Sequence, residues 1–559
     1  MSHTAAARLA NRRIRLLIAL FALFFALALA RAGWLQAVRG DGLGQLASSQ
    51  HRQTVAVPAH RGTIYDRLGV ELAIGARAVT VYANPREIRE PRLVAVAAGR
   101  ELGLDPDKLY PLLADRSRGF VYIQRKADPA KAEALERRGI AGLGFYPEER
   151  RTYPQRDVAG EVVGYAGVDN RGLTGIELAL DDVLAGKDGE KTIVTDPFGR
   201  TLDVVESVPG SDGKDVYLTI DNTIQGYVER VLRDTRQRWS AASASAVVLD
   251  PRTGGILALG VVPGFDANRF PRTPAERQRN RAVTDTYEPG STFKIVTIAG
   301  ALESGSVEPS TRFTLPYGIQ VADRIIHDAV KRGTQTMSVA QILSQSSNVG
   351  VITVALELGK ERLNDWVERF GFGRRTGVEF PGETKGIVLP SDRWSGSTIG
   401  NVPIGQGIAV TPVQMAAAYG ALANKGVWMQ PHLVERLGNG ESLQPKRRRI
   451  VSTQTARQVR SMLRGVVEEG SGTAAQVPGY RIAGKTGTAA KPEPTGGYSD
   501  YRYVASFVGY VPARDPRLVI LVTVDEPRGA IWGGTVAAPA FAEIAKFALQ
   551  YLEVPPDRN

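Results

Sequence analysis

The sequence contains no cysteine among its 559 residues. This absence excludes disulfide bonds, thiol nucleophiles and cysteine-ligated metal sites. Histidine is also scarce, with five residues and none of the paired spacings that bind zinc. A covalent nucleophile in this chain therefore has to be serine, threonine or lysine, and we expect no metal and no other cofactor.

The sequence also lacks clusters in which Lys or Arg alternate with aromatic residues, although the formal net charge is +12. Such clusters are typical of nucleic-acid interfaces, so we expect no nucleic-acid binding. A basic exterior is compatible with an anionic surface such as lipid headgroups or wall polymer. Hydrophobic residues make up 43% and charged residues 23%, as in a folded body in water, and the length predicts two or more domains.

One long apolar run stands out near the N-terminus, LLIALFALFFALALA at 16–30, and four arginines precede it. Extended to 14–35, it would form a helix of about 33 Å, enough to cross a hydrocarbon core of about 30 Å. Arg31 then lies near the end of the span, where its side chain can reach the headgroups. We predict a tail at 1–13 in the cytoplasm and a transmembrane anchor at 14–35.

A cleaved signal peptide is the alternative, because Ala28-Leu29-Ala30 resembles a small-residue cleavage site. Under both interpretations the rest of the chain lies outside the cytoplasm, because the arginines precede the apolar run.

The exported body divides by pattern into two parts. Residues 41–207 alternate β-branched runs with helical stretches, which predicts an α+β module. The turn-rich stretch 208–215 is typical of a linker. Residues 216–555 begin and end with paired strands and have helices between them, which predicts one α/β domain.

Three short motifs follow one another in the second part. They are Ser291-Thr-Phe-Lys294, Ser346-Ser-Asn348 and Lys485-Thr-Gly-Thr488. S-x-x-K, S-x-N and K-T-G occur together in penicillin-binding proteins and class A β-lactamases. A second S-x-x-K, Ser211 to Lys214, lies in the linker and has no helix behind it.

Ser291 opens the helical run STFKIVTIAGALE, with Lys294 one turn along on the same face. The two side chains are therefore expected to touch. A helix N-terminus favours negative charge on an attacked carbonyl. Lys294 becomes a base only if its pKa falls, and burial beside Lys485 would lower it. Standing alone, Ser291 would be an ordinary N-cap residue.

The other two motifs provide groups for the substrate. Ser346 and Asn348 end the helical stretch MSVAQILSQ, where they can relay a proton and hold an amide. Lys485, Thr486 and Thr488 follow a strand-like run and are expected to bind a carboxylate, with the Thr488 N–H pairing with that of Ser291 in an oxyanion hole.

Gly487 is expected to leave room for a peptide lying against the strand.

Residues 479–486 also match the P-loop pattern G-x-x-x-x-G-K-[ST]. A P-loop needs a long helix after the motif. Pro492 and Pro494 prevent that helix, so nucleotide binding is not expected.

With these motifs the chain resembles the class B penicillin-binding proteins. Further segments resemble family boxes to which we assign structural roles: Arg61 to Arg67, Arg151 to Pro154, Gly175 to Glu177, Gly405 to Gly407 and Thr411 to Gln414. Phe370 to Gly373 and Phe380 to Glu383 resemble the division-specific branch, penicillin-binding protein 3. Length also fits that branch.

The resemblance implies a β-lactamase-like serine acyltransferase domain that follows a pedestal of the dimerisation type. Ser291 would attack the D-Ala-D-Ala bond of a peptidoglycan stem peptide, release D-Ala and pass the acyl group to an amine, and β-lactams would trap it. Lys294, Ser346, Asn348 and Lys485 would be catalytic. Thr486, Gly487, Thr488, Ile531 and Trp532 would bind substrate.

The resemblance also implies a place in the bacterial inner membrane with the catalytic domain in the periplasm. A SEDS-type glycosyltransferase and other divisome proteins would be partners. The alternatives are an elongation-type transpeptidase, a hydrolase on the same fold, and a β-lactam sensor or divisome scaffold without turnover.

Overall fold

The computed structural model describes residues 3–38, 52–195, 201–494 and 496–557. Contacts between residues divide the chain into two compact units, one with the described residues up to Ala59 together with Gly186–Asp212, and one with His60–Ala185 together with Gly213 onward. The expected start of the pedestal at residue 41 lies outside the described residues. The division into 41–207 and 216–555 stays a prediction.

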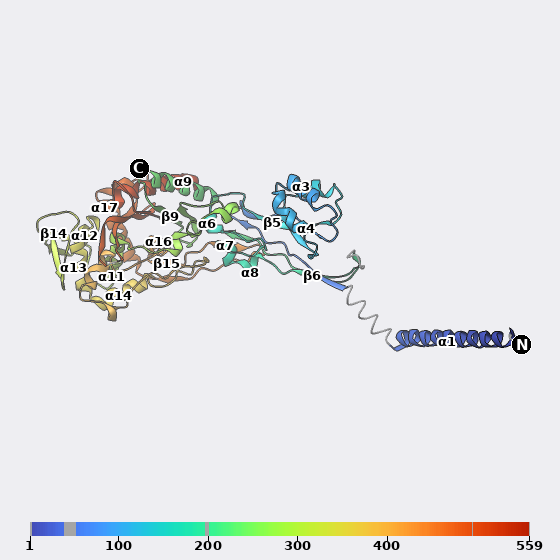
Figure 1. Ribbon diagram of the computed structural model, residues 1–559. Helices are drawn as coiled ribbons and strands as arrows, with labels where there is room; N and C mark the ends of the chain where they lie inside the picture. Colours follow the sequence, from blue (N-terminus) through green and yellow to red (C-terminus); the bar gives the residue numbers. More distant parts are fainter. Residues whose placement is uncertain (1–2, 39–51, 196–200, 495, 558–559) are drawn as a thin grey trace. The chain divides into compact units, whose positions relative to one another are not determined.

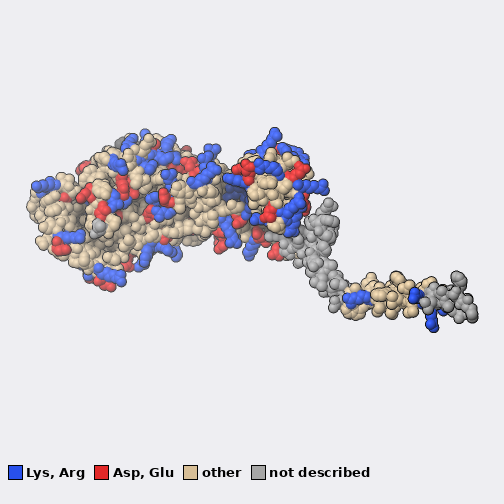
Figure 2. Space-filling view, in the orientation of Figure 1, with Lys and Arg blue, Asp and Glu red and all other residues tan. Residues whose placement is uncertain are grey.

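The first unit contains the long helix α1, His3–Val38, and a three-stranded antiparallel sheet. Residues 11–37 of α1 form the single stretch, within the described part of the chain, that is long and apolar enough to cross a membrane. The predicted anchor at 14–35 falls inside it. Figure 2 shows this helix as an uncharged stretch with basic side chains at both ends.

The sheet of the first unit has the order β1-β6-β7, with β1 at Arg52–Val57, β6 at Gly189–Thr195 and β7 at Thr201–Val208. The stretch expected to be a linker is tied to this unit. Ser211 and Lys187 exchange both backbone hydrogen bonds, each 2.8 Å long. The first half of the stretch 208–215 therefore continues this sheet, and its role as a linker between two domains stays a prediction.

A mixed sheet in the second unit runs in the order β16-β8-β2-β3-β4, and β5 pairs with β3. The short strand β2 lies parallel to β8, with Ile64 opposite Val216. This sheet therefore joins residues from both sides of the stretch 208–215. The strands are β2 Ile64–Tyr65, β3 Glu71–Ala83, β4 Val121–Ala127, β5 Leu143–Thr152, β8 Val216–Leu218 and β16 Val434–Leu437.

Three helices cover one face of β3 and β4, where Val81, Ile88 and Leu113 belong to one buried cluster. They are α3 Pro91–Leu102, α4 Pro106–Ala114 and α5 Pro129–Glu136, each with proline at its first or second position. Proline suits these positions because its fixed φ matches the helix and no N–H is needed there.

Three of the five boxes given structural roles meet in one buried ion network. The Glu177 side chain is fully buried and receives hydrogen bonds from Nε of Arg61 at 2.7 Å and from Nε of Arg151 at 2.6 Å. Arg61 also donates to Asp181 at 2.6 Å, and Tyr153 donates to Glu177 at 3.3 Å. Each buried charge is thus matched by opposite charge and hydrogen bonds, as burial requires.

The main sheet of the second unit is antiparallel and five-stranded, in the order β10-β9-β20-β19-β18. Its strands are β9 Ser243–Leu249, β10 Ile256–Val262, β18 Ala483–Pro492, β19 Tyr498–Val511 and β20 Leu518–Asp525. The strand pairs predicted around residue 250 and around the turn at 512–516 are confirmed.

Alternate residues of the main sheet enter two different cores. Ala246 and Val248 pack with α9, Asn222–Arg238, and α19, Ala538–Tyr551. Val247 and Leu249 belong to the core that contains α11, Lys294–Glu303, and α16, Pro412–Ala423. The sheet is therefore sandwiched between helices (Figure 1), as an α/β domain predicts.

The remaining helices are α6 Gly160–Val163, α7 Gly175–Ala179, α8 Asp181–Leu184, α10 Arg281–Thr284, α12 Val339–Ser344, α13 Asn348–Leu358, α14 Lys360–Arg369, α15 Thr398–Asn401, α17 Thr453–Glu468 and α18 Gly533–Val536. The remaining strands are β11 Arg312–Leu315, β12 Gly318–Val321, β13 Arg324–His327, β14 Gln335–Ser338, β15 Val427–Met429 and β17 Arg447–Arg449.

We predict that Glu177→Gln destabilises the chain strongly, because it leaves the buried guanidinium group of Arg151 without a carboxylate and leaves that of Arg61 with Asp181 alone. Breaking a buried pair in this way costs about 3–5 kcal/mol. Thermal unfolding of the full chain measures the effect. Arg92→Ala is the control, since the Arg92–Asp107 pair is exposed and should contribute less than about 1 kcal/mol. Equal melting temperatures for the two variants would contradict the prediction.

Candidate active site

Ser291 lies in a tight turn, not in the first turn of an α-helix. Residues Gly290–Phe293 form a 3₁₀ turn, and α11 begins at Lys294. The expectation that the α-helix opens at Ser291 is therefore wrong by one turn. Gly290 has φ +55°, which favours glycine, and its N–H donates to Gly405 O at 3.1 Å. These contacts fix the turn before the serine.

Lys294 is completely buried at the start of α11. Its Nζ donates to Ser346 O at 2.6 Å, to Asn348 Oδ1 at 2.7 Å and to Ser346 Oγ at 3.2 Å. The first two motifs are thus joined by the lysine. No hydrogen bond joins Lys294 Nζ to Ser291 Oγ among the described residues, so the expected contact between these two side chains stays a prediction.

Ser346 and Asn348 lie between two helices. Ser346 follows α12 with φ +61°, Ser347 caps α13 by accepting from the Gly350 N–H at 2.9 Å, and Asn348 is the first residue of α13. The prediction that the motif ends a helix is right for Ser346, whereas Asn348 begins the next helix. The left-handed conformation of Ser346 changes the direction of the chain between the two helices. The side chains of Ser346 and Asn348 therefore both reach Lys294.

Asp328 anchors this motif and was missed by the sequence analysis. Its side chain is 8% exposed. Oδ1 accepts the N–H groups of Asn348 at 2.6 Å and Val349 at 3.0 Å, and the Ser347 hydroxyl donates to the same carboxylate at 3.0 Å. Arg332 pairs with the other oxygen at 2.5 Å. A carboxylate at the start of α13 also suits the helix dipole.

Lys485 is a second fully buried lysine, located in β18. Its Nζ donates to Ser346 Oγ at 2.9 Å and to Thr486 O at 3.3 Å. Burial lowers the pKa of Lys485 to about 7. Burial also lowers the pKa of Lys294 well below its ordinary value, the charge of Lys485 lowers it further, and Asp328 opposes the change. This direction agrees with the expectation from the sequence.

The third motif lies inside β18, not after a strand. Lys485 pairs with Val508 of β19, and Thr488 pairs with Ala505. Because β18 is the last strand in the order of the sheet, its other side is a free edge. An extended peptide can add to such an edge as a further strand.

Gly487 has a role that the sequence analysis did not foresee, while the room it leaves for a peptide stays a prediction. A Cβ at this position would lie 2.3 Å from Ser506 Oγ and 2.9 Å from Pro289 O. The missing side chain therefore admits the turn before Ser291 against β18. Thr488 O would be 3.0 Å from a Cβ on Gly290, which shows how closely this turn approaches the strand.

Trp532 and Ile531 differ in their relation to the site. Trp532 is 54% exposed and lines a pocket of about 570 Å³ together with Ser291. Ile531 lines a separate surface hollow with Tyr501 and Trp532. The Gly533 N–H donates to Thr488 Oγ1 at 3.1 Å, which holds this segment against β18. Only Trp532 of the expected pair therefore borders the pocket that contains the serine.

The pocket gathers all three motifs, and Asp328, Ser346, Asn348, Thr486 and Thr488 line it with Ser291. β18 continues to Pro492 where a P-loop would need a helix, so the strand also excludes a nucleotide site at 479–486. The geometry offers a serine hydroxyl, a buried amine of lowered pKa, a relay hydroxyl between two lysines and a strand edge. These are the parts of an acyl-transfer site.

Two family models match the chain. "Penicillin binding protein transpeptidase domain" matches residues 244–546, and "Penicillin-binding Protein dimerisation domain" matches residues 56–218.

The chain is also similar to named proteins over nearly its whole length. It is 35% identical to the "Probable peptidoglycan D,D-transpeptidase PenA" of Neisseria gonorrhoeae, over 98% of this chain and 94% of that protein. It is 32% identical to the "Peptidoglycan D,D-transpeptidase FtsI" of Escherichia coli K12, over 98% and 92%. The crystal structure of penicillin-binding protein 3 from Mycobacterium tuberculosis with ampicillin has a TM-score of 0.72 at 33% identity, covering 90% of this chain and 98% of that one.

We predict that Asp328→Asn slows acylation by a fluorescent penicillin about tenfold, because charge-assisted hydrogen bonds to the start of α13 are weakened. The variant also removes a charge that raises the pKa of Lys294. The low-pH limb of the acylation rate should therefore move to lower pH, since Lys294 would lose its proton earlier. Labelling reactions that are quenched at a series of times, at several pH values, measure both the acylation rate and its pH dependence.

Asp323→Asn is the matched control, because Asp323 is an exposed residue of the neighbouring hairpin. A low-pH limb that moves upward in Asp328→Asn, or an unchanged rate, would contradict the prediction.

Proposed function

Because the chain belongs to the class B penicillin-binding proteins and is a serine-type D-Ala-D-Ala transpeptidase of peptidoglycan synthesis, we propose that Ser291 is its nucleophile. Lys294, Ser346, Asn348 and Lys485 complete the catalytic set. The observation that supports this assignment best is the meeting of two buried lysines at the Ser346 hydroxyl.

The proposed acylation begins with neutral Lys294, which takes the proton of Ser291 Oγ as the oxygen attacks the carbonyl carbon between the two D-Ala residues. The Oγ–C bond forms and the carbonyl becomes an oxyanion. The backbone N–H groups of Ser291 and Thr488 stabilise it, and the close approach of the 290–291 turn to β18 supports this pairing.

Collapse of this intermediate breaks the C–N bond. Ser346 Oγ, which contacts both lysine amines, relays a proton to the departing nitrogen, and D-Ala leaves. An acceptor amine then attacks the acyl carbon, and a new C–N bond forms as the ester bond to Ser291 Oγ breaks. The proton that the amine releases passes through Lys294 to Ser291 Oγ.

Substrate binding is proposed at the edge of β18. Lys485, Thr486 and Thr488 bind the terminal carboxylate, which opposes the lowering of the Lys485 pKa by burial. Gly487 positions the turn of Ser291 against the strand, and Trp532 forms an apolar wall. Ile531, which lies beside Trp532, contacts the substrate at the periphery of the site.

The cellular setting is also proposed. One N-terminal apolar helix, with arginines at its start, supports a single-pass protein of the inner membrane whose catalytic domain faces the periplasm. The likeness to penicillin-binding protein 3 and FtsI supports a septal role. A SEDS-type glycosyltransferase and other divisome proteins are proposed as partners, with the pedestal and anchor as the contact region.

We expect fluorescent penicillin to label the full chain on the peptide that contains Ser291, and Ser291→Ala to abolish the label. Peptide mass spectrometry locates the adduct. Ser211→Ala is the matched control, because Ser211 starts the other S-x-x-K sequence and should leave labelling unchanged. Label that persists in Ser291→Ala, or a loss caused by Ser211→Ala, would refute the assignment of the nucleophile.

A further inference from the structure

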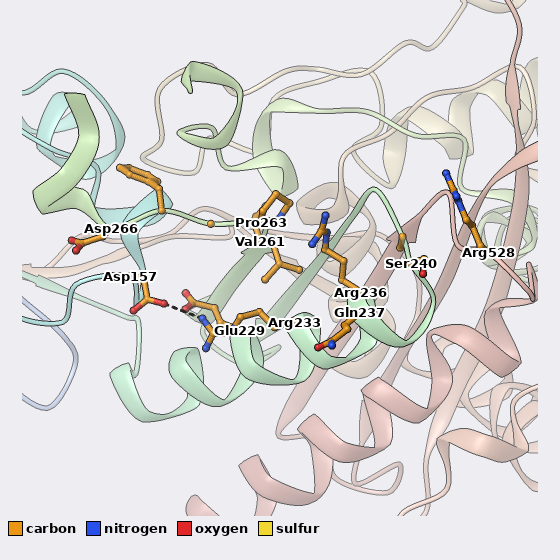
Figure 3. A pocket seen from close by; sticks show the side chains of 14 residues that line it. Asp157, Glu229, Arg233, Arg236, Gln237, Ser240, Val261, Pro263, Asp266 and Arg528 are labelled. Carbon is orange, nitrogen blue, oxygen red and sulfur yellow. Dashed lines mark hydrogen bonds and ion pairs between the residues drawn. The ribbon is translucent and has the colours of Figure 1, made fainter. Parts of the chain in front are cut away.

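A second pocket, of about 840 Å³, lies beside α9 and shares no lining residue with the pocket of Ser291. Its apolar floor comes from the end of β10 and the segment after it, with Val261, Pro263 and Phe265. Charged and polar side chains surround this floor (Figure 3). The volume falls in the range of pockets that bind small organic ligands.

One face of α9 forms a wall of the pocket. Glu229, Arg233, Arg236, Gln237 and Ser240 all line it. The spacing of four, three and one residues places the first four in one stripe of α9, and Ser240 follows just after the helix ends. Along this stripe Glu229 and Arg236 are about 10 Å apart, which is the length of about three residues of extended peptide.

The pocket has an acidic end. Asp157, Asp266 and Glu229 lie toward one side of the view in Figure 3, where Arg233 pairs with Asp157 at 3.0 Å. Glu229 is 3% exposed, and its hydrogen bonds among the described residues, from Ala159 N at 2.9 Å and Gln225 Nε2 at 2.7 Å, all reach Oε1. No hydrogen bond within the described residues reaches its second oxygen, Oε2, and the residue borders the pocket.

A second buried carboxyl group, that of Glu161, lies close to Glu229 at this end. Glu161 is 1% exposed, its Oε1 accepts from the Phe265 N–H at 2.8 Å, and its Oε2 is buried without a hydrogen-bond partner. Burial, and then Glu229, raise the pKa of Glu161 well above its ordinary value. Burial raises the pKa of Glu229 to about 7. A cation bound here would favour the charged form of Glu229 and so oppose the effect of burial.

The pocket also has a basic end. Arg236 and Arg528 lie toward the other side of the view in Figure 3. Arg236 Nε donates to Ala242 O at 3.2 Å, and the Arg528 backbone N–H donates to Trp239 O at 2.7 Å. Within the described residues neither guanidinium group forms an ion pair, which leaves two forked donors for a carboxylate.

We propose that this pocket binds a zwitterionic peptide, with an ammonium group at Glu229 and a carboxylate between Arg236 and Arg528. That the peptide is a peptidoglycan stem peptide rests on the proposed function, because such peptides carry both groups. The pocket would hold a second strand of the polymer on the enzyme while Ser291 reacts with another.

The test uses the full chain in detergent with Ser291 already acylated by penicillin, so that the first pocket is blocked. The probe is a synthetic pentapeptide with one lysine side chain and a free C-terminal D-Ala-D-Ala carboxylate, and calorimetry measures its binding. We expect Arg236→Ala with Arg528→Ala to weaken binding at least about tenfold, the effect of losing one charge-assisted hydrogen bond or more. Arg238→Ala, on α9 but outside the pocket, should bind as the parent does.

Two modified probes test the ends separately. Every probe has an acetylated N-terminus, so acetylation of the lysine amine removes the one remaining ammonium group. A C-terminal amide removes the carboxylate of the last D-Ala. Each should weaken binding to the acylated parent at least about tenfold.

Binding should also strengthen from pH 6 to pH 8, because Glu229 must lose its proton to attract the ammonium group. Asp157, Glu161, Arg233 and Asp266 are the charged or titratable groups that surround it. Glu229→Gln should bind weakly at both pH values. The proposal would be overturned if the probe did not bind to the acylated chain. It would also be overturned if the affinity were unchanged in the arginine double variant and in Glu229→Gln. Neither result would affect the labelling of Ser291.

Discussion

The site depends on the burial of two lysines against one hydroxyl group. Lys294 and Lys485 are both fully buried, and both donate to Ser346 Oγ, at 3.2 and 2.9 Å. Their amines are therefore at most about 6 Å apart, where two positive charges repel by about 3 kcal/mol at an effective dielectric constant of 20. Such a repulsion corresponds to about two pKa units. Burial lowers both pKa values as well, and for each lysine it is the larger effect. Together, burial and repulsion disfavour charge on both amines at neutral pH, which favours one neutral amine that can act as a base.

The rest of the domain keeps this arrangement in place. Lys485 is fixed by the ladder between β18 and β19, and Lys294 by the first turn of α11. Ser346 takes a left-handed backbone conformation, which costs free energy for a residue with a Cβ. Asp328 offsets that cost by holding the start of α13 through several short hydrogen bonds. Lys294 and Lys485 meet at Ser346 because rigid elements hold each of the three residues in place.

The sequence predicted the motifs, the helices α9 and α19 and the strand pairs of the main sheet, because periodicity and turn residues act locally. It did not predict Asp328, since an aspartate 18 residues before Ser346 has no spacing that marks it as a partner. It also did not predict the 3₁₀ turn at Ser291, or the sheet that joins β2 to β8 across the stretch 208–215. These features depend on contacts between distant segments, as does the role of Gly487 in admitting the turn.

The most direct test of the lysine pair is a titration of the Lys294 side chain by NMR, with labelled lysine in the full chain and assignment by Lys294→Arg. We expect the Lys294 amine to lose its proton well below the ordinary lysine range, and this midpoint to rise when Lys485 is replaced by methionine. The assignment of Lys294 as the base would be contradicted if its amine stayed protonated up to about pH 10. It would also be contradicted if the titration midpoint were the same in Lys485→Met as in the parent.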